Sequence, residues 1–192
     1  MKKPYIVGIG GGTASGKSTL CARLEQVFSG WRVRAFHLDE YFREDRPTVE
    51  APFTGKPYRD DNHPAHTLDL DRAAADLAEA AASGEYDLIL LEGAWALSWE
   101  TLREQFDLKL FVDCRSDERL VRRIRRNTAW GLSFDEITNV YLDLVRYRHD
   151  EFVEPARWYA DLVLNGSGMP ETGERVVTDY IRTQLDQKED SK

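Results

Sequence analysis

The sequence holds few cysteines, no long apolar run and no excess of positive charge. Its 192 residues include two cysteines, Cys21 and Cys114, whose spacing fits neither a metal site nor a redox pair. We expect both to be buried thiols in a reducing compartment. No apolar stretch approaches the roughly 20 residues that cross a bilayer, and the N-terminal run is too short and glycine-rich for a signal peptide. We therefore expect a cytoplasmic protein without a membrane partner.

The charge balance argues against nucleic acid as the main partner. Lysine and arginine number 26 against 34 aspartate and glutamate residues, which gives a formal net charge of -8 at pH 7. Proteins that bind nucleic acid over a wide surface are more often basic. Hydrophobic residues make up 42% of the chain, which is enough for a core. The length favours one domain over residues 1–192 and leaves a homo-oligomer open.

A glycine-rich stretch near the N-terminus, GIGGGTASGKSTL at residues 8–20, carries the strongest signal. It contains the P-loop pattern Gly-x-x-x-x-Gly-Lys-Ser, in which backbone N–H groups and a helix N-terminus cradle phosphates. Lys17 would meet the β- and γ-phosphates, and Ser18 is placed to bind Mg²⁺. The alternative is a turn that binds nothing, but the predicted strand before it and helix after it are the context that the motif requires. We therefore predict nucleotide contacts from Gly11, Thr13, Ala14, Ser15, Gly16, Lys17, Ser18 and Thr19.

The apolar pattern alternates between strand and helix along the chain. We predict strands at residues 5–9, 31–39, 86–93, 108–114 and 160–166. Predicted helices follow the glycine-rich loop and occupy residues 68–85, 116–129, 133–153 and 173–186. The predicted helix at residues 133–153 begins with a capping box, Ser133 to Glu136. Residues 43–67 hold four prolines and predict a long loop with at most short helices. The alternation favours an α/β fold, a three-layer P-loop sandwich with five parallel strands and helices on both faces.

Two acidic residues end predicted strands, at the sheet edge where ligands of α/β proteins bind. Asp39 is placed to accept the proton of an acceptor hydroxyl, unless it merely caps a helix that starts at Glu40. Glu92 ends the apolar strand LILLE, with a surface turn before Gly93 as the alternative. The motifs Asn-Lys-x-Asp and Asp-x-x-Gly do not occur, which argues against a GTPase switch. A small-molecule kinase needs such carboxylates near the acceptor and the metal.

The segment ERLVRRIRR concentrates positive charge on one side of a predicted helix. Arg119, Arg122, Arg123 and Arg126 follow the spacing i, i+3, i+4, i+7, so four guanidinium groups share one face. A solvated face paired with nearby carboxylates accounts for some of them. In a chain of net charge -8, phosphate contact by at least one or two is the favoured interpretation.

In this order the motifs resemble the uridine kinase group of the phosphoribulokinase/uridine kinase family, over about residues 5–166. The blocks that match are GGTASGKST, HLDEYF, NHPAHTLD, LILLEG, LFVDCRSDERLVRRIRRN and YLDLVRYRHDEFVEPARWYADLVL. The resemblance implies ATP and Mg²⁺ as cofactors and Asp39 as the general base. It implies that Lys17, Ser18 and Thr19 hold the phosphates and Mg²⁺, with Glu92 near the metal. It also implies an arginine-rich lid at about 122–135, whose Arg123 and Arg126 reach the phosphates.

The same resemblance outlines an acceptor side formed by a loop at about 40–67. Tyr41 or Phe42 would wall the acceptor pocket, and His63 belongs to the matched His-Pro segment. Asn62 stands where the family usually has an aspartate that binds ribose hydroxyls, with Asp61 beside it as a substitute. Trp95 and Trp99 follow the Glu92 strand and either stack on an acceptor ring or serve as cap and core aromatics.

Two departures from the family concern the acceptor. Uridine kinases carry a base-reading β-hairpin after the helix that here ends at Gly84, whereas this chain runs through Tyr86 into the next strand. The lid segment reads TAWGLS, with Trp130 and Leu132 near positions where the family has arginines. The chain also resembles nicotinamide riboside kinases in its short length and its YLDLVRYR stretch.

The prediction is transfer of the ATP γ-phosphoryl group to a small-molecule hydroxyl, foremost the 5′-hydroxyl of uridine or cytidine. The alternatives are a kinase for nicotinamide riboside or another small alcohol, and an ATP-binding regulatory protein without phosphotransfer.

Overall fold

A parallel β-sheet forms the centre of the protein in the computed structural model, which describes residues 3–168 and 171–190. Its strand order is β2-β5-β1-β6-β7, and each neighbouring pair is parallel. The five parallel strands and the α/β class confirm the prediction. The strands span β1 Tyr5–Gly11, β2 Val33–His37, β5 Leu88–Glu92, β6 Leu108–Asp113 and β7 Leu162–Asn165. A separate antiparallel pair consists of β3 Thr48–Glu50 and β4 Pro57–Arg59.

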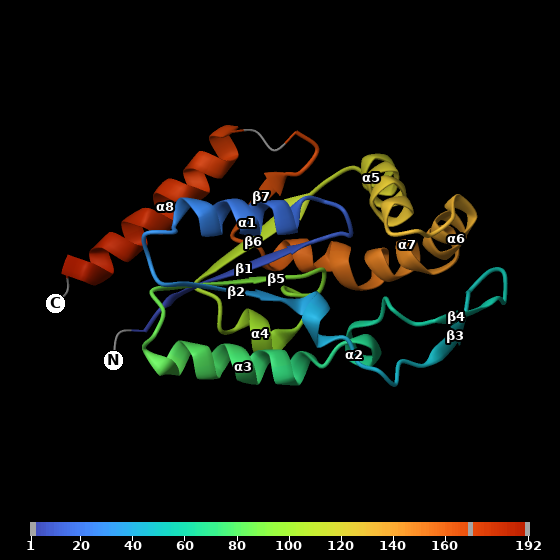
Figure 1. Ribbon diagram of the computed structural model, residues 1–192, viewed down its shortest axis with the longest axis horizontal. Helices are drawn as coiled ribbons and strands as arrows, with labels where there is room; N and C mark the ends of the chain where they lie inside the picture. Colours follow the sequence, from blue (N-terminus) through green and yellow to red (C-terminus); the bar gives the residue numbers. More distant parts are fainter. Residues whose placement is uncertain (1–2, 169–170, 191–192) are drawn as a thin grey trace.

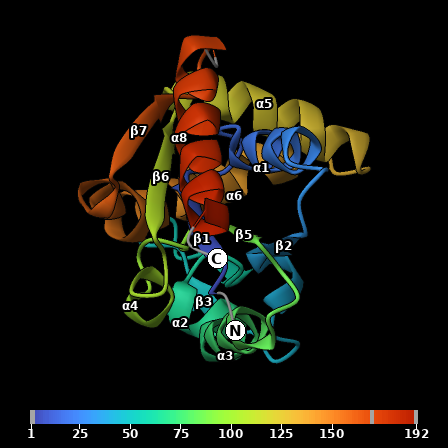
Figure 2. The same cartoon turned by 90° about the vertical axis from the view of Figure 1, so that its left-hand side faces the viewer.

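Helices cover both faces of the sheet (Figure 1). Figure 2 shows α1 and α8 over one face and α3 and α4 over the other. The helical segments, in chain order, are α1 Lys17–Val27, η1 Leu38–Tyr41, α2 Pro64–Thr67, α3 Leu70–Ser83, α4 Glu100–Arg103, α5 Ser116–Ala129, α6 Phe134–Val140, η2 Tyr141–Val145, α7 Arg146–Arg148, η3 His149–Val153, η4 Glu154–Tyr159 and α8 Glu171–Asp190. In the described part of the chain no helix is long and apolar enough to span a membrane.

The central strand β1 is buried along its whole length because helices pack on both of its sides. Val7 and Ile9 face a cluster with Leu20 and Leu24 of α1 and apolar residues of α8. Ile6, which precedes Val7, joins a second cluster with α3, β5 and β6 on the opposite face. This two-sided burial explains why β1 reads as a continuous apolar run rather than an alternating one. Both cysteines are free and buried, as expected, and burial raises the pKa of the Cys21 thiol to about 12.

The segment 43–67 differs from its prediction as a loop with at most short helices. It contains the β3–β4 hairpin as well as α2. Val49 pairs with Tyr58 across the hairpin, and Gly55 has φ +63° in its turn, a left-handed conformation that glycine adopts without strain. The strands are only three residues long and largely exposed, so no apolar alternation marked them.

The helix predicted at 133–153 begins as expected and then departs from regular α-geometry. The Ser133 side chain accepts from the Glu136 N–H, and Glu136 accepts from the Ser133 N–H in return, which confirms the capping box. Two π-helical stretches, η2 and η3, flank α7, and a 3-10 turn extends the helical region to Tyr159. Such π-stretches often occur at functional sites, and these lie beside the cavity described below.

Candidate active site

The P-loop joins the central strand to α1 at the carboxyl edge of the sheet. Gly11 ends β1 and Lys17 begins α1, and the backbone between them adopts positive φ at Gly11 (143°), Ala14 (59°) and Gly16 (109°). Gly16 caps α1 without a side-chain hydrogen bond, and the first turn holds no acidic residue. The helix N-terminus therefore keeps N–H groups and positive potential for an anion.

Glu92, at the end of β5, contacts the side chains of Ser18, His37 and Lys17. Its Oε1 accepts from Ser18 Oγ at 3.0 Å and lies 3.0 Å from His37 Nδ1. Lys17 Nζ lies 3.8 Å from Oε2. Glu92 is only 5% exposed, so the alternative of a surface turn does not hold. This placement follows from the parallel register, in which Glu92 is the partner of both Ile9 and His37.

The Ser18–Glu92 pair fits a magnesium ion. Glu92 Oε2 is buried without a hydrogen-bond partner, which leaves one carboxylate oxygen for a cation or its water. Within residues 3–168 and 171–190 no three His, Cys, Asp or Glu side chains form a metal cluster. Mg²⁺ is commonly bound by one or two protein oxygens together with waters and substrate phosphates, so a pair suffices.

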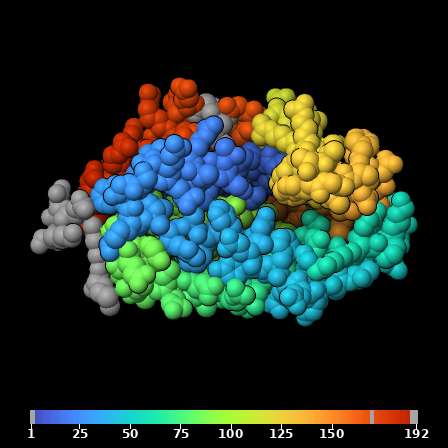
Figure 3. Space-filling view, in the orientation of Figure 1, coloured from blue at the N-terminus to red at the C-terminus, as the bar shows by residue number. Residues whose placement is uncertain are grey.

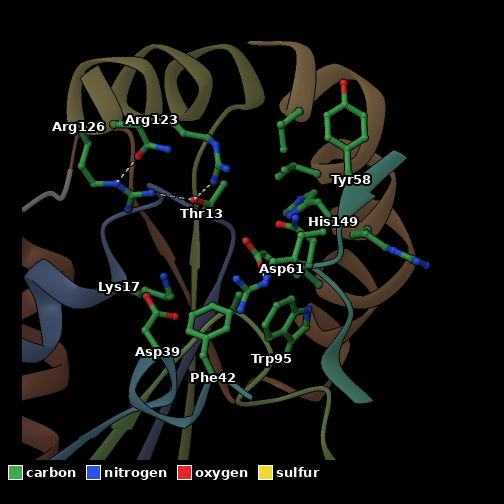
Figure 4. A pocket seen from close by; sticks show the side chains of 18 of the residues that line it. Thr13, Lys17, Asp39, Phe42, Tyr58, Asp61, Trp95, Arg123, Arg126 and His149 are labelled. Atoms are coloured by element: carbon green, nitrogen blue, oxygen red, sulfur yellow. Dashed lines mark hydrogen bonds and ion pairs between the residues drawn. The ribbon is translucent and has the colours of Figure 1, made fainter. Parts of the chain in front are cut away.

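The four arginines of α5 divide into two groups. Arg119 is 5% exposed and its Nε donates to the Cys114 carbonyl, while Arg122 donates to the Gly166 and Ser167 carbonyls. These two attach α5 to the end of β6 and to the segment after β7. Arg123 and Arg126 point the other way, and both donate to Thr13 Oγ1 of the P-loop, at 3.1 and 3.3 Å (Figure 4).

Arg123 and Arg126 place positive charge over the P-loop without a direct counter-ion. Neither forms an ion pair within the described residues. Burial lowers the pKa of Arg123, and the neighbouring Arg126 lowers it further. Burial also lowers the pKa of Arg126, which Asp39 partly offsets. Both groups stay charged because the guanidinium keeps its proton at any working pH. Two like charges held together and partly desolvated are stabilised by an anion, as a phosphate would be.

A cavity of about 470 Å³ lies beside the P-loop, between α5 and the 40–67 segment. Thr13, Lys17 and Asp39 line it at one end, together with Arg123 and Arg126. Asp39 lies within η1, whose N-cap is His37, so Asp39 is not the helix cap that was the alternative. Figure 3 shows α5 and α6 lying above the chain segment that includes β3 and β4.

A second cavity, of about 440 Å³, also lies at the P-loop. Ala14, Gly16, Ser18 and Thr19 line it, as do Arg122 and the side chains of Lys17 and Arg126. Lys17 and Arg126 therefore line both cavities. Ser15 lines neither, since it is fully buried and its N–H donates to the Gly12 carbonyl.

The predicted acceptor residues are only partly brought together. Phe42, Asp61, Asn62 and Trp95 line the larger cavity. Tyr41 does not, because its hydroxyl donates to Asp76 of α3 at 2.9 Å and its ring lies in the core. Tyr41, the last residue of η1, and its C-cap Phe42 point in different directions, so Phe42 alone of the pair reaches the cavity.

Two further predicted residues also fall outside the cavity lining. His63 is the N-cap of α2, accepts from the Ala65 N–H and stacks on His66. Trp99 packs against the core and its Nε1 donates to Asp71 at 3.3 Å. Tyr41 and His63 therefore lie outside the cavity lining, and Trp99 packs as a core aromatic.

Several lining residues were not expected from the sequence. Tyr58 and Arg59 come from β4, and Val140, Val145, Arg148 and His149 come from the irregular helical region after α5. Arg148 pairs at 3.2 Å with Asp60, which is fully buried. Burial and the nearby Arg119 lower the pKa of His149. Nothing in the pattern of the stretch YLDLVRYRH marks which of its sides faces a cavity.

Comparison with known proteins gives the site a context. Residues 56–172 match the model of the Phosphoribulokinase / Uridine kinase family. The chain is 30% identical over 205 residues to a uridine kinase from Deinococcus deserti, covering 95% of this chain and 98% of that protein. It is 30% identical over 213 residues to uridine-cytidine kinase B from Dictyostelium discoideum, covering 98% and 85%.

Solved structures share the fold at lower identity. A proposed fructose transport system kinase from Silicibacter sp. TM1040 superposes with a TM-score of 0.67 at 18% identity, covering 85% of this chain and 90% of that one. A proposed uridine kinase from Bacillus stearothermophilus superposes with a TM-score of 0.53 at 21% identity, covering 85% and 89%. These likenesses concern the arrangement of the sheet and helices.

Proposed function

Because this chain belongs to the phosphoribulokinase/uridine kinase family, we propose that it transfers the γ-phosphoryl group of ATP to a hydroxyl of a small molecule, with the 5′-hydroxyl of uridine or cytidine as acceptor. The observation that carries the proposal is the shared wall between the two cavities. Lys17 and Arg126 line both, and Asp39 lines only the larger one. A phosphoryl group that moves from one cavity to the other passes these side chains.

In this proposal ATP occupies the smaller cavity with its phosphates on the P-loop. Lys17, Arg123 and Arg126 stabilise the charge that spreads over the transferring group, which is the main task of the protein in phosphoryl transfer. Mg²⁺, when bound with ATP, neutralises charge on the β- and γ-phosphates. Ser18 and Glu92 would hold it. Asp39 accepts the proton of the acceptor hydroxyl from the larger cavity.

The arginines of α5 and the facing 40–67 segment enclose the transfer site from two sides. We propose that α5 and the turn after it, about residues 122–135, act as the lid. The Arg123 and Arg126 contacts to Thr13 are the closing contacts. Closure excludes water, which would otherwise accept the phosphoryl group in place of the intended hydroxyl.

The charge of the larger cavity favours an acceptor without positive charge. Five Lys or Arg side chains and two carboxylates line it. The nicotinamide ring of nicotinamide riboside is cationic, whereas uridine and cytidine are neutral. The cavity therefore favours a pyrimidine nucleoside over nicotinamide riboside, although the base-reading hairpin of uridine kinases is absent between Gly84 and β5.

An acceptor panel tests the proposal. ADP release is measured with ATP, Mg²⁺ and, in turn, uridine, cytidine, adenosine, nicotinamide riboside, pantothenate and glycerate. We expect turnover with uridine and cytidine and little with nicotinamide riboside. Turnover confined to another acceptor would keep the mechanism and replace the substrate. No ADP release with any acceptor of the panel, with ATP binding intact, would contradict the proposal and favour a regulatory ATP-binding protein.

Two neighbouring arginines on α5 allow the effect of positive charge at the transfer site to be distinguished from the effect of positive charge elsewhere on the helix. Arg126→Ala is expected to lower kcat at least roughly tenfold, because it removes one of the groups that face the transferring phosphoryl. Arg125→Ala is the matched control, since Arg125 is exposed on the same helix and is absent from both cavity linings. Its kcat is expected to stay within about twofold of the unmodified enzyme. Equal losses in steady-state assays of both variants would contradict a direct role for Arg126.

A further inference from the structure

The β3–β4 hairpin forms a wall of the larger cavity far from where the uridine kinases carry theirs. Tyr58 and Arg59, the last residues of β4, line the cavity together with Val140 and Val145 of the α6–η2 region. In the resembled family the base-reading hairpin follows the helix that here is α3. In this chain α3 ends at Ser83 and β5 begins at Leu88, which leaves no room for it.

The hairpin is fastened to the opposite wall by one carboxylate. Asp143, in the π-helical segment η2, accepts from Tyr58 Oη at 2.7 Å and from Thr54 Oγ1 at 3.1 Å. Phe53 and Tyr147 extend this contact, with ring centroids 5.1 Å apart. The hydrogen bond to Asp143 raises the pKa of Tyr58, so the phenol remains a donor at neutral pH.

The hairpin has little else to hold its outer end. Its strands are three residues long, and isolated two-stranded hairpins are at best marginally stable. Phe53 is 78% exposed at the tip. At the base, Asp60 is buried and its N–H donates to the Pro47 carbonyl at 2.8 Å, so the base is anchored independently of the tip. The tip contacts therefore set how closely Tyr58 approaches the cavity.

We propose that the β3–β4 hairpin is the acceptor-contacting wall of this enzyme and that Asp143 is the positioning residue that closes it. The inference rests on the proposed function. Tyr58 spans the two features, because its ring lines the cavity while its hydroxyl bonds Asp143. The hairpin acts on the acceptor alone, since neither β3 nor β4 contributes to the lining of the smaller cavity at the P-loop.

Kinetics of Asp143 variants test the inference. Asp143→Ala is expected to raise the acceptor KM roughly tenfold, because two hydrogen bonds to a charged group are lost, while the ATP KM stays within about twofold. Asp143→Asn keeps an accepting oxygen and is expected to recover most of the acceptor affinity. Asp186→Ala, an exposed aspartate of α8 that lines neither cavity, is the control and is expected to leave both constants unchanged.

A double-mutant cycle separates positioning from general destabilisation. Tyr58→Phe removes only the hydroxyl that bonds Asp143, and it serves on its own if Asp143→Ala fails to fold. The effects of Tyr58→Phe and Asp143→Ala on acceptor KM are expected to be non-additive, because both break the same contact. Fully additive effects would contradict the inference.

Hydrogen exchange supplies a readout that does not depend on turnover. Backbone amides of residues 48–59 are expected to exchange faster in Asp143→Ala than in the unmodified enzyme. In the unmodified enzyme, these amides are expected to exchange more slowly when the acceptor that the enzyme phosphorylates is added. Faster exchange with an unchanged acceptor KM would overturn the inference and leave the proposed function standing. An unmodified enzyme that turns over no acceptor would overturn the proposed function and, with it, this inference.

Discussion

Replacing Lys17 with alanine is expected to lower kcat/KM for ATP by roughly 10³-fold or more, which leaves no measurable activity in a routine ADP-release assay. The side chain lies at the junction of both cavities and lines each of them. Its charge is held in place by Glu92 at 3.8 Å, and the residue is only 8% exposed. Among the described residues no other lysine lines either cavity, so none of them can supply a second ammonium group there.

The Lys17 experiment needs a check on folding, because its removal leaves the buried Glu92 with less compensation. Lys17→Gln keeps most of the volume and a donor, and its thermal unfolding midpoint shows whether the fold survives. Lys109→Ala is the matched control. Lys109 lies on β6 and pairs with Asp161 at 3.1 Å. Retained activity in a folded Lys17 variant would refute the assignment of the P-loop.

Asp39→Asn is expected to lower kcat roughly 10²-fold or more and to leave the Kd for ATP within about twofold. Asparagine keeps the size of the side chain but is not a base. The selective effect follows from placement, because Asp39 lines the larger cavity and is absent from the lining of the smaller one. Steady-state kinetics and equilibrium ATP titration measure the two quantities separately.

The neighbouring Glu40→Gln is the control for Asp39→Asn. Glu40 is exposed in the same 3-10 turn and lines neither cavity, so its loss is expected to change kcat by less than about twofold. Equal losses of ATP binding and turnover in Asp39→Asn would argue that Asp39 supports the structure rather than the proton transfer.

The parts of the site on regular strands were predictable, since parallel strands bring their carboxyl ends to one edge. The glycines and Lys17 mark the turn after β1 by their order alone, and Glu92 ends an apolar run that is typical of a buried strand. From these spacings follow the position of the P-loop and of Glu92 at one sheet edge, where the structure adds a hydrogen bond from Ser18 Oγ to Glu92 at 3.0 Å. The helical spacing predicted the four α5 arginines on one face, whereas Arg122 bonds the Gly166 carbonyl and Arg123 bonds Thr13 of the P-loop.

The remaining features depend on tertiary contacts that leave no local pattern. Helical spacing does not predict that Arg122 bonds the Gly166 carbonyl while Arg123 bonds Thr13. The direction of Tyr41 is set by Asp76 on α3, which is 35 residues away. Tyr58 of the β3–β4 hairpin bonds Asp143, 85 residues further along the chain, so a short exposed segment reads as a loop until its partner is known.

The most direct test of the central claim is to identify the phosphorylated product by ³¹P nuclear magnetic resonance after incubation with ATP, Mg²⁺ and uridine. We expect a phosphomonoester at the 5′-oxygen of uridine, formed in proportion to ADP and strongly reduced with Asp39→Asn at the same reaction time. Inorganic phosphate as the sole new phosphorus species, or ADP formed equally without uridine, would contradict phosphotransfer to this acceptor.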